Sequence, residues 1–135
     1  MNERRTIIRG GRLLTLQDGP AGTTPVHGTI VIKGDRIASA GPEDAAPQPG
    51  DEIVDGTGKL FLPGFVNTHG HAAMSLLRGY KDDVNLQVWL EQYMWPAEAK
   101  FTGRDVRAGA ELAMLEMVRN GITAFMDMYD HMDQV

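Results

Sequence analysis

The sequence contains no cysteine, and this absence excludes disulfides, thiolate metal ligands and cysteine nucleophiles. It also excludes a cysteine-ligated zinc site of the kind found in cytidine deaminases. Basic residues are scarce as well: 13 Lys and Arg stand against 18 Asp and Glu, which gives a formal net charge of −5. A nucleic-acid partner is therefore not expected, because no basic stripe is present to neutralise phosphates.

Long apolar runs are also missing. No stretch approaches the ~20 apolar residues that a membrane-spanning helix requires, and residues 1–10 are too short and too interrupted for a signal peptide. What is present is an ordinary globular composition, with 42% hydrophobic and 23% charged residues. These features predict a soluble cytoplasmic protein with no membrane partner.

The first part of the chain has the pattern of a small all-β unit. Short β-rich pieces are separated by Gly, Pro and Asp, and the glycines Gly10 and Gly11 indicate a turn between two of them. Two further pieces flank Lys33-Gly34-Asp35, which is typical of a hairpin. We interpret residues 1–58 as the N-terminal β-sandwich portion, with strands at residues 6–8, 13–16, 28–32, 36–40 and 52–55.

After Leu60 the apolar period changes from two to about 3.6. Residues 60–67 form a mostly apolar run and predict a buried strand, and residues 122–129 predict a second one. Between them the pattern predicts helices at residues 72–77, 86–99 and 103–119. Pro96 is expected to break or kink the second of these helices, while Thr102 and Asp105 form a capping pair for the third. Residues 59–135 are therefore interpreted as a βαβ segment with parallel strands, of the α/β class.

His69-Gly70-His71 stands at the end of the first of these strands. In an extended chain, residues i and i+2 point to the same side, so both imidazoles could reach one metal ion. The carboxyl end of a parallel strand is where α/β barrels place catalytic groups. Imidazole binds zinc and also iron, manganese, cobalt or nickel, so the pair alone does not identify the metal.

Each candidate residue also has a plainer interpretation. A bare His-x-His triplet is weak evidence because it also arises by chance. Glu98 on its own is typical of a solvated surface acid, and Trp89 at helical spacing is typical of core packing rather than substrate stacking. Asp127 alternates with two methionines, so it could face a barrel interior or equally cap a loop.

The residues around the histidine pair resemble the first barrel strand of the amidohydrolase superfamily. Its hallmark is Pro-Gly, a short apolar strand, Asn or Asp, any residue, then His-x-His, and residues 62–71 read LPGFVNTHGH. Residues 53–59 (IVDGTGK) match the stretch that precedes the barrel in this superfamily. The resemblance covers essentially the whole chain. It implies the start of a metal-dependent hydrolase (β/α)8 TIM-like barrel, incomplete in this chain and preceded by a small β-sandwich.

A narrower resemblance follows from residues 72–79 (AAMSLLRG), from Trp89-Leu90 and Pro96-Ala97-Glu98, and from residues 121–129 (GITAFMDMY). These look like the deaminase branch, most nearly the 5-methylthioadenosine/S-adenosylhomocysteine deaminases. Guanine deaminases and s-triazine chlorohydrolases share much of the pattern and stay open as alternatives. In adenosine-type members a Glu after the Trp-containing helix binds the ribose hydroxyls, and the matching residue here is Glu98.

The resemblance implies hydrolytic deamination of a small adenosine-type nucleoside with one divalent ion, most simply zinc. His69 and His71 would be two of the metal ligands. The superfamily needs a further His and Asp as ligands and a Glu as general acid/base, all from later strands, and none is matched in this sequence. No catalytic residue of that kind is therefore expected within this chain.

Length agrees with this expectation. A complete (β/α)8 barrel takes ~250 residues, whereas 135 − 58 = 77 residues follow the β unit. We therefore expect the chain to be the N-terminal part of a longer enzyme and to be inactive alone, with a homo-oligomeric state of that enzyme left open. The remaining alternative is a non-catalytic β-rich binding module with a short α/β extension.

Overall fold

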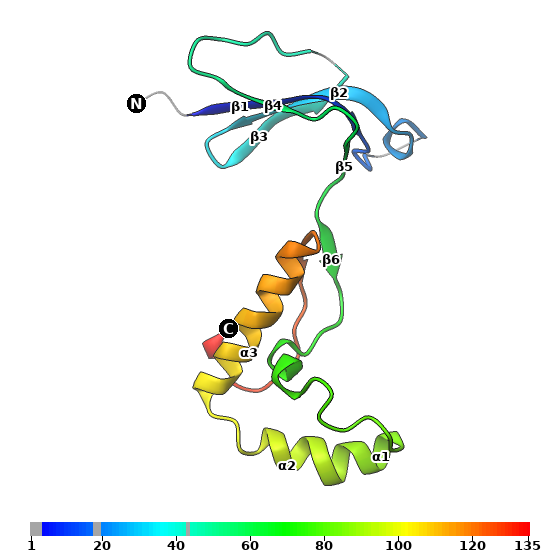
Figure 1. Cartoon of the computed structure of the whole chain (residues 1–135), viewed down its shortest axis with the longest axis vertical. Coiled ribbons are helices and arrows are strands. Elements are labelled where there is room, and N and C mark those ends of the chain that lie inside the picture. Colours follow the sequence, from blue (N-terminus) through cyan, green and yellow to red (C-terminus); the bar gives the residue numbers. More distant parts are fainter. Residues whose placement is uncertain (1–3, 18–19, 43) are drawn as a thin grey trace. The chain divides into compact units, whose positions relative to one another are not determined.

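A computed structural model describes residues 4–17, 20–42 and 44–135. The chain divides into two compact units, Met1–Pro63 and Gly64–Val135 (Figure 1). The sequence pattern placed the boundary between residues 58 and 59. In the structure a short strand, β5 (Leu60–Phe61), still pairs with the first strand of the β unit, so backbone hydrogen bonding carries that unit past residue 59.

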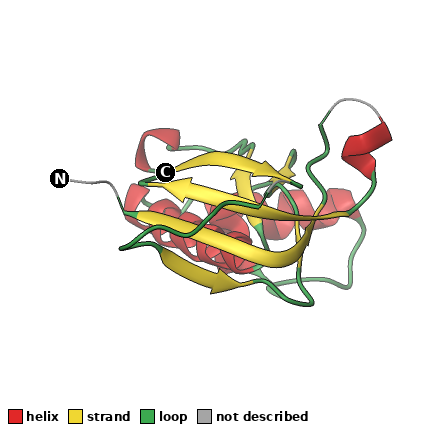
Figure 2. Cartoon of the chain, turned by 90° about the horizontal axis from the view of Figure 1, so that it is seen from above, coloured by secondary structure: helices red, strands yellow, loops and turns green. Residues whose placement is uncertain are grey.

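The first unit is a five-stranded sheet (Figure 2). Strand β1 (Arg5–Leu13) pairs antiparallel with β2 (Val26–Lys33) and parallel with β4 (Glu52–Asp55) and β5, and β3 (Arg36–Gly41) pairs antiparallel with β2. The predicted hairpin between β2 and β3 is confirmed. A 3-10 turn, η1 (Pro20–Thr23), lies between β1 and β2. All the described strands of this unit lie in one sheet, so the second sheet of a sandwich is not part of this stretch.

The turn predicted at Gly10 and Gly11 was wrong, because β1 continues through both residues. The register against β2 shifts between Ile8 and Gly11, which is a β-bulge. Gly10 has φ +83°, and a Cβ on Gly11 would lie 2.3 Å from the Phe61 ring. These glycines therefore allow a bulge and a close approach inside one strand instead of ending it.

The second unit is a βαβ segment. Strands β6 (Phe65–Asn67) and β7 (Ile122–Phe125) pair in parallel, as predicted, and helix α3 (Gly103–Arg119) lies between them in the sequence. The predicted strand at residues 60–67 was wrong as one element, because β5 and β6 pair in different sheets. The strand predicted to reach residue 129 ends at Phe125. The shorter elements are η2 (Ala72–Leu77) and η4 (Met132–Gln134).

Pro96 does not interrupt the helix that contains it. Residues 86–98 form consecutive helical elements, namely α1 (Leu86–Val88), a π-helical turn η3 (Trp89–Met94) and α2 (Trp95–Glu98). Proline is tolerated in the first turn of a helix, where its missing N–H is not needed. Pro96 lies at the start of α2, directly after the π turn, so the proline coincides with a change of helix type and not with a break in the helical segment.

Helix α3 packs on η2 through small residues. Ala72, Ala110 and Ala113 form a buried cluster, and a Cβ on Gly109 would lie 2.4 Å from the carbonyl oxygen of Ala73. The Ser75 hydroxyl donates to the Gly109 carbonyl at 2.7 Å. This close packing holds the segment that directly follows His71 against the longest helix of the unit.

The N-terminus of α3 is capped as the sequence predicted. The Asp105 carboxylate accepts from the backbone N–H and the hydroxyl of Thr102, at 2.8 and 2.6 Å. These bonds lower the pKa of Asp105 from its usual value, with the hydroxyl bond as the largest cause. Within the described part of the chain, no helix combines the length and apolarity needed to cross a membrane.

Candidate functional site

The segment that carries His69 and His71 begins where β6 ends. Asn67 fixes this point twice: its side-chain oxygen accepts from the His69 N–H at 3.2 Å, and its carbonyl accepts from the Met126 N–H at 2.8 Å. The two imidazoles then lie edge to face, with ring centroids 5.2 Å apart and planes at 88°. The structure therefore brings the predicted pair together in the bend that follows the strand.

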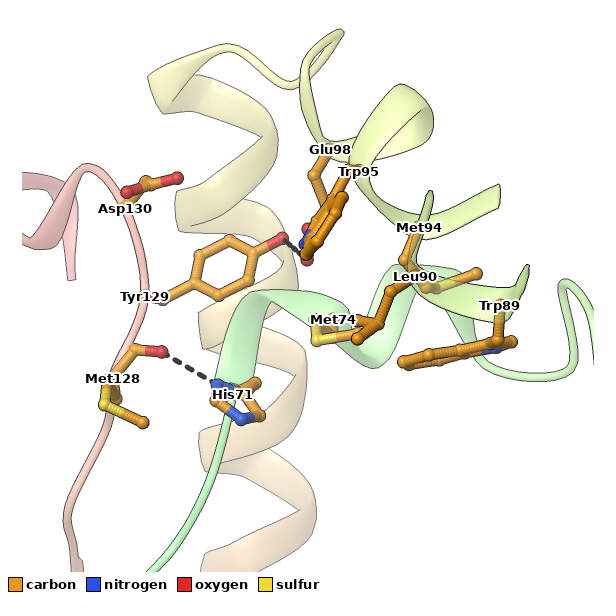
Figure 3. Close-up of a pocket in the computed structure, with 10 residues that line it drawn as sticks. All are labelled: His71, Met74, Trp89, Leu90, Met94, Trp95, Glu98, Met128, Tyr129 and Asp130. Atoms are coloured by element: carbon orange, nitrogen blue, oxygen red, sulfur yellow. Dashed lines mark hydrogen bonds between the residues drawn. The ribbon is translucent and has the colours of Figure 1, made fainter. Parts of the chain in front are cut away.

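The His71 ring is held by one well-defined hydrogen bond. Its Nδ1 lies 2.7 Å from the carbonyl oxygen of Met128, in the segment after β7 (Figure 3). A carbonyl can only accept, so Nδ1 carries a proton, and in the neutral imidazole Nε2 then keeps its lone pair. Metal-binding histidines commonly use one nitrogen for the ion and donate the other N–H to a carbonyl or carboxylate.

The separation of the two imidazole rings is compatible with a shared metal ion. A tetrahedral ion bound at about 2.0–2.1 Å from each ring nitrogen holds two imidazole centroids roughly 5 Å apart, close to the separation observed here. Two ligands are not a complete site, however. Among the described residues, no group of three or more His, Asp or Glu side chains is placed to hold a metal ion.

Asp127 ties the strand end after β7 to the histidine segment. Its Oδ1 accepts from the backbone N–H of Ala72 at 3.1 Å and of Met128 at 2.8 Å. Its Oδ2 is buried and has no hydrogen-bond partner in the described part of the chain. Through Oδ1 the Asp127 carboxylate thus binds the backbone of the residue after His71 and of Met128, whose carbonyl binds the His71 ring.

A cavity of about 400 Å³ opens between His71 and the helical segment at residues 86–98 (Figure 3). Both Trp89 and Glu98 line it, so the structure places these two candidates beside His71. The other lining residues are mostly apolar or aromatic: Met74, Leu90, Met94, Trp95, Met128, Tyr129 and Asp130. Apolar walls with a few convergent polar groups are typical of small-molecule sites.

Tyr129 lines this cavity and makes a specific contact there, although the sequence did not single it out as a site residue. Its hydroxyl donates to Glu98 Oε1 at 2.9 Å (Figure 3), and its ring lies 6.5 Å from the His71 ring between centroids. Burial, and then the neighbouring Glu98, raise the pKa of Tyr129 well above its usual value. The available sequence signal was its position two residues after Asp127, beyond the end of a parallel strand.

Comparison with known proteins agrees with this geometry. The model of the amidohydrolase family matches residues 60–135, more than half of the chain, which include the histidine pair and Glu98. The chain belongs to the amidohydrolase family. This finding confirms the superfamily and the barrel-type fold class that the His-x-His motif and its flanking residues indicated.

Among the relatives, a 5-methylthioadenosine/S-adenosylhomocysteine deaminase from Symbiobacterium thermophilum is 45% identical over 134 residues, covering 97% of this chain and 30% of the relative. A 5'-deoxyadenosine deaminase from Methanosarcina mazei is 46% identical over 128 residues, covering 95% and 29%. The crystal structure of a zinc-bound adenosine deaminase from Xanthomonas campestris superposes with a TM-score of 0.83 at 29% identity, covering 96% and 30%. The chain of this amidohydrolase thus spans about 30% of the length of the relatives it matches.

Proposed function

We propose that the protein containing this chain is a metal-dependent aminohydrolase that removes the amino group of an adenosine-type nucleoside and releases ammonia. One observation carries the proposal: His71, one of a paired set of imidazoles, lines the same cavity as Glu98. A candidate metal ligand and a candidate sugar contact therefore share one cavity. Relatives of this chain are named as deaminases of 5-methylthioadenosine, S-adenosylhomocysteine and 5'-deoxyadenosine, which supports the same substrate class.

His69 and His71 would hold the metal ion, His71 through Nε2 because Nδ1 is bonded to Met128. Zinc is favoured because a solved relative carries it, although imidazole also suits iron, manganese, cobalt or nickel. When bound, a divalent ion lowers the pKa of water toward neutrality and so makes a nucleophile available. The contribution of this chain is to hold the backbone around the two histidines through Asn67 and Asp127, and to orient the His71 ring through the Met128 carbonyl.

Glu98 would bind the ribose hydroxyls of the substrate. A carboxylate accepts several hydrogen bonds and forms stronger ones than a neutral acceptor does. Trp89, Leu90 and Met94 give the cavity an apolar wall against which the rest of a nucleoside can pack. The remaining metal ligands and the general acid/base would come from residues outside this chain. We also propose that the protein is cytoplasmic and that its partner is a nucleoside and not a nucleic acid.

The test is ammonia release by the full-length protein. The zinc-loaded enzyme should act on 5'-methylthioadenosine, S-adenosylhomocysteine and 5'-deoxyadenosine, lose activity with a chelator and regain it with zinc. Guanine and an s-triazine are offered in parallel, because they represent the other activities of the resemblance. Turnover of guanine or the triazine in preference to every adenosine-type substrate would overturn the proposal, as would full activity after complete metal removal.

A further inference from the structure

The side chain of Glu98 is held by a residue from a distant part of the sequence. Glu98 is the last residue of α2, whereas Tyr129 follows β7, and 31 positions separate them. The 2.9 Å bond from the Tyr129 hydroxyl to Oε1 is partly buried, and both residues line the cavity (Figure 3). Among the residues that the structure describes, no Lys, Arg or His forms an ion pair with Glu98.

This bond limits what the carboxylate can do. A free glutamate side chain samples many rotamers, and ordering it on substrate binding costs conformational entropy. With Oε1 engaged by the phenol, Glu98 still has acceptor positions on Oε2. The backbone that leads into Tyr129 is also held, because the preceding residue, Met128, is bonded through its carbonyl to His71 and through its N–H to Asp127. A chain of contacts thus runs from the histidine to the carboxylate.

We propose that Tyr129 is a positioning residue that aims the Glu98 carboxylate at the substrate's ribose and so links selectivity for ribose hydroxyls to the segment holding His71. The inference rests on the proposed function, since it takes Glu98 as the sugar contact. Tyr129 itself need not touch the substrate. Its effect should therefore appear in how the enzyme distinguishes a ribose with hydroxyls from one without them, and should vanish once Glu98 is changed.

The experiment compares adenosine with 2',3'-dideoxyadenosine as substrates of the full-length zinc enzyme. Wild type, Tyr129→Phe, Glu98→Gln and the double variant are assayed, with Tyr80→Phe as the matched control, because Tyr80 is exposed and does not line the cavity. We expect Glu98→Gln to lower the preference for adenosine in kcat/KM by roughly tenfold or more, and Tyr129→Phe by roughly threefold to tenfold, mainly through KM. The double variant should match Glu98→Gln alone, and Tyr80→Phe should match wild type.

The outcomes distinguish failure of Glu98 as the sugar contact from failure of Tyr129 as its positioning residue. An unchanged preference in Glu98→Gln would remove the sugar contact from the proposed function. A lowered preference in Glu98→Gln with an unchanged one in Tyr129→Phe would overturn only the role of Tyr129. Equal losses of kcat/KM for adenosine and 2',3'-dideoxyadenosine in Tyr129→Phe would show that the Tyr129 hydroxyl has a merely structural role, and would overturn the positioning role. A further loss in the double variant would show that Tyr129 contacts the ribose directly. Bound zinc should be unchanged in Tyr129→Phe, because His71 is held by a backbone carbonyl.

Discussion

The two units of this chain bury their apolar residues in different ways. In the first unit, Ile7, Leu13 and Val31 lie buried on adjacent strands of one hydrogen-bonded sheet. In the second, burial occurs mainly where helices meet, at Met94, Val106 and the alanine cluster of η2 and α3. The strands there stay open, and Phe65 and Val66 of β6 are 57% and 60% exposed.

The chemistry is concentrated in the second unit. His69, His71, Glu98 and Tyr129 all lie within Gly64–Val135, and the hydrogen bonds that orient them join segments far apart in the sequence. The first unit also has a histidine, His27, and carboxylates such as Asp35, but its described residues show no ring contact like the one between His69 and His71. The comparison of the two units indicates that a site forms where the ends of parallel strands are brought together, and that the presence of particular residue types is not enough.

The largest expected effect is loss of the metal ligands. His69→Ala or His71→Ala in the full-length protein should remove bound zinc and lower turnover by more than the ~10–100-fold typical for loss of a ligand's hydrogen-bond partner. The matched control is His27→Ala, an exposed histidine of the first unit, which should leave metal content and activity unchanged. Metal content is measured by elemental analysis after dialysis. Normal zinc in both site variants would contradict the assignment.

Core truncations should separate stability from site geometry. Ile7→Ala and Met94→Ala each remove a side chain that is at most 1% exposed, so each should lower the free energy of unfolding by about 2–5 kcal/mol. Urea unfolding measures this. Only Met94 lines the cavity, and we therefore expect KM for the nucleoside to rise in that variant alone. A matching rise in KM for Ile7→Ala would show that the first unit shapes the site directly.

Removing the Asp127 carboxylate should cost less but act on both stability and metal. Asp127→Ala leaves the N–H groups of Ala72 and Met128 without their acceptor, which is expected to cost about 1–3 kcal/mol. Weaker zinc binding should follow, because these residues flank and support His71. Asp127→Asn keeps one acceptor oxygen and should be milder in both measurements. Equal effects of the two substitutions would indicate that the charge, not the acceptor, is what counts.

The smallest effect concerns pH. The pKa of Asp105 is lowered by its bonds to Thr102, so the folded state holds this carboxylate ionised more strongly than the unfolded state does. Its stabilisation is complete above the unfolded pKa of about 3.9 and is lost as pH falls through the lower folded value. The thermal midpoint should thus fall less steeply below pH ~4 in Asp105→Asn than in wild type. Asp35→Asn, at an exposed position of the first unit, should keep the wild-type slope.

Local signals in the sequence predicted several elements well. Glycine with aspartate between β-rich runs predicted the β2–β3 hairpin, and the 3.6-residue apolar period with Thr102 and Asp105 predicted α3. Local signals failed where contacts with another segment of the chain determine the structure. The bulge in β1 depends on its register with β2 and on the ring of Phe61 against Gly11. Residues 60–67 divide between two sheets because each half finds a different partner strand.

For the site, the sequence by itself determined that two imidazoles lie close together, because spacing of two residues at a strand end leaves little freedom. It also placed Glu98 and Trp89 on a helical segment, and resemblance to a family connected Glu98 with a substrate. Only the tertiary structure decided that Met128 orients His71 and that Tyr129 holds Glu98, across 57 and 31 residues of sequence. Such bonds form only after parallel pairing of β6 with β7 brings both strand ends to one edge, and no local pattern encodes that approach.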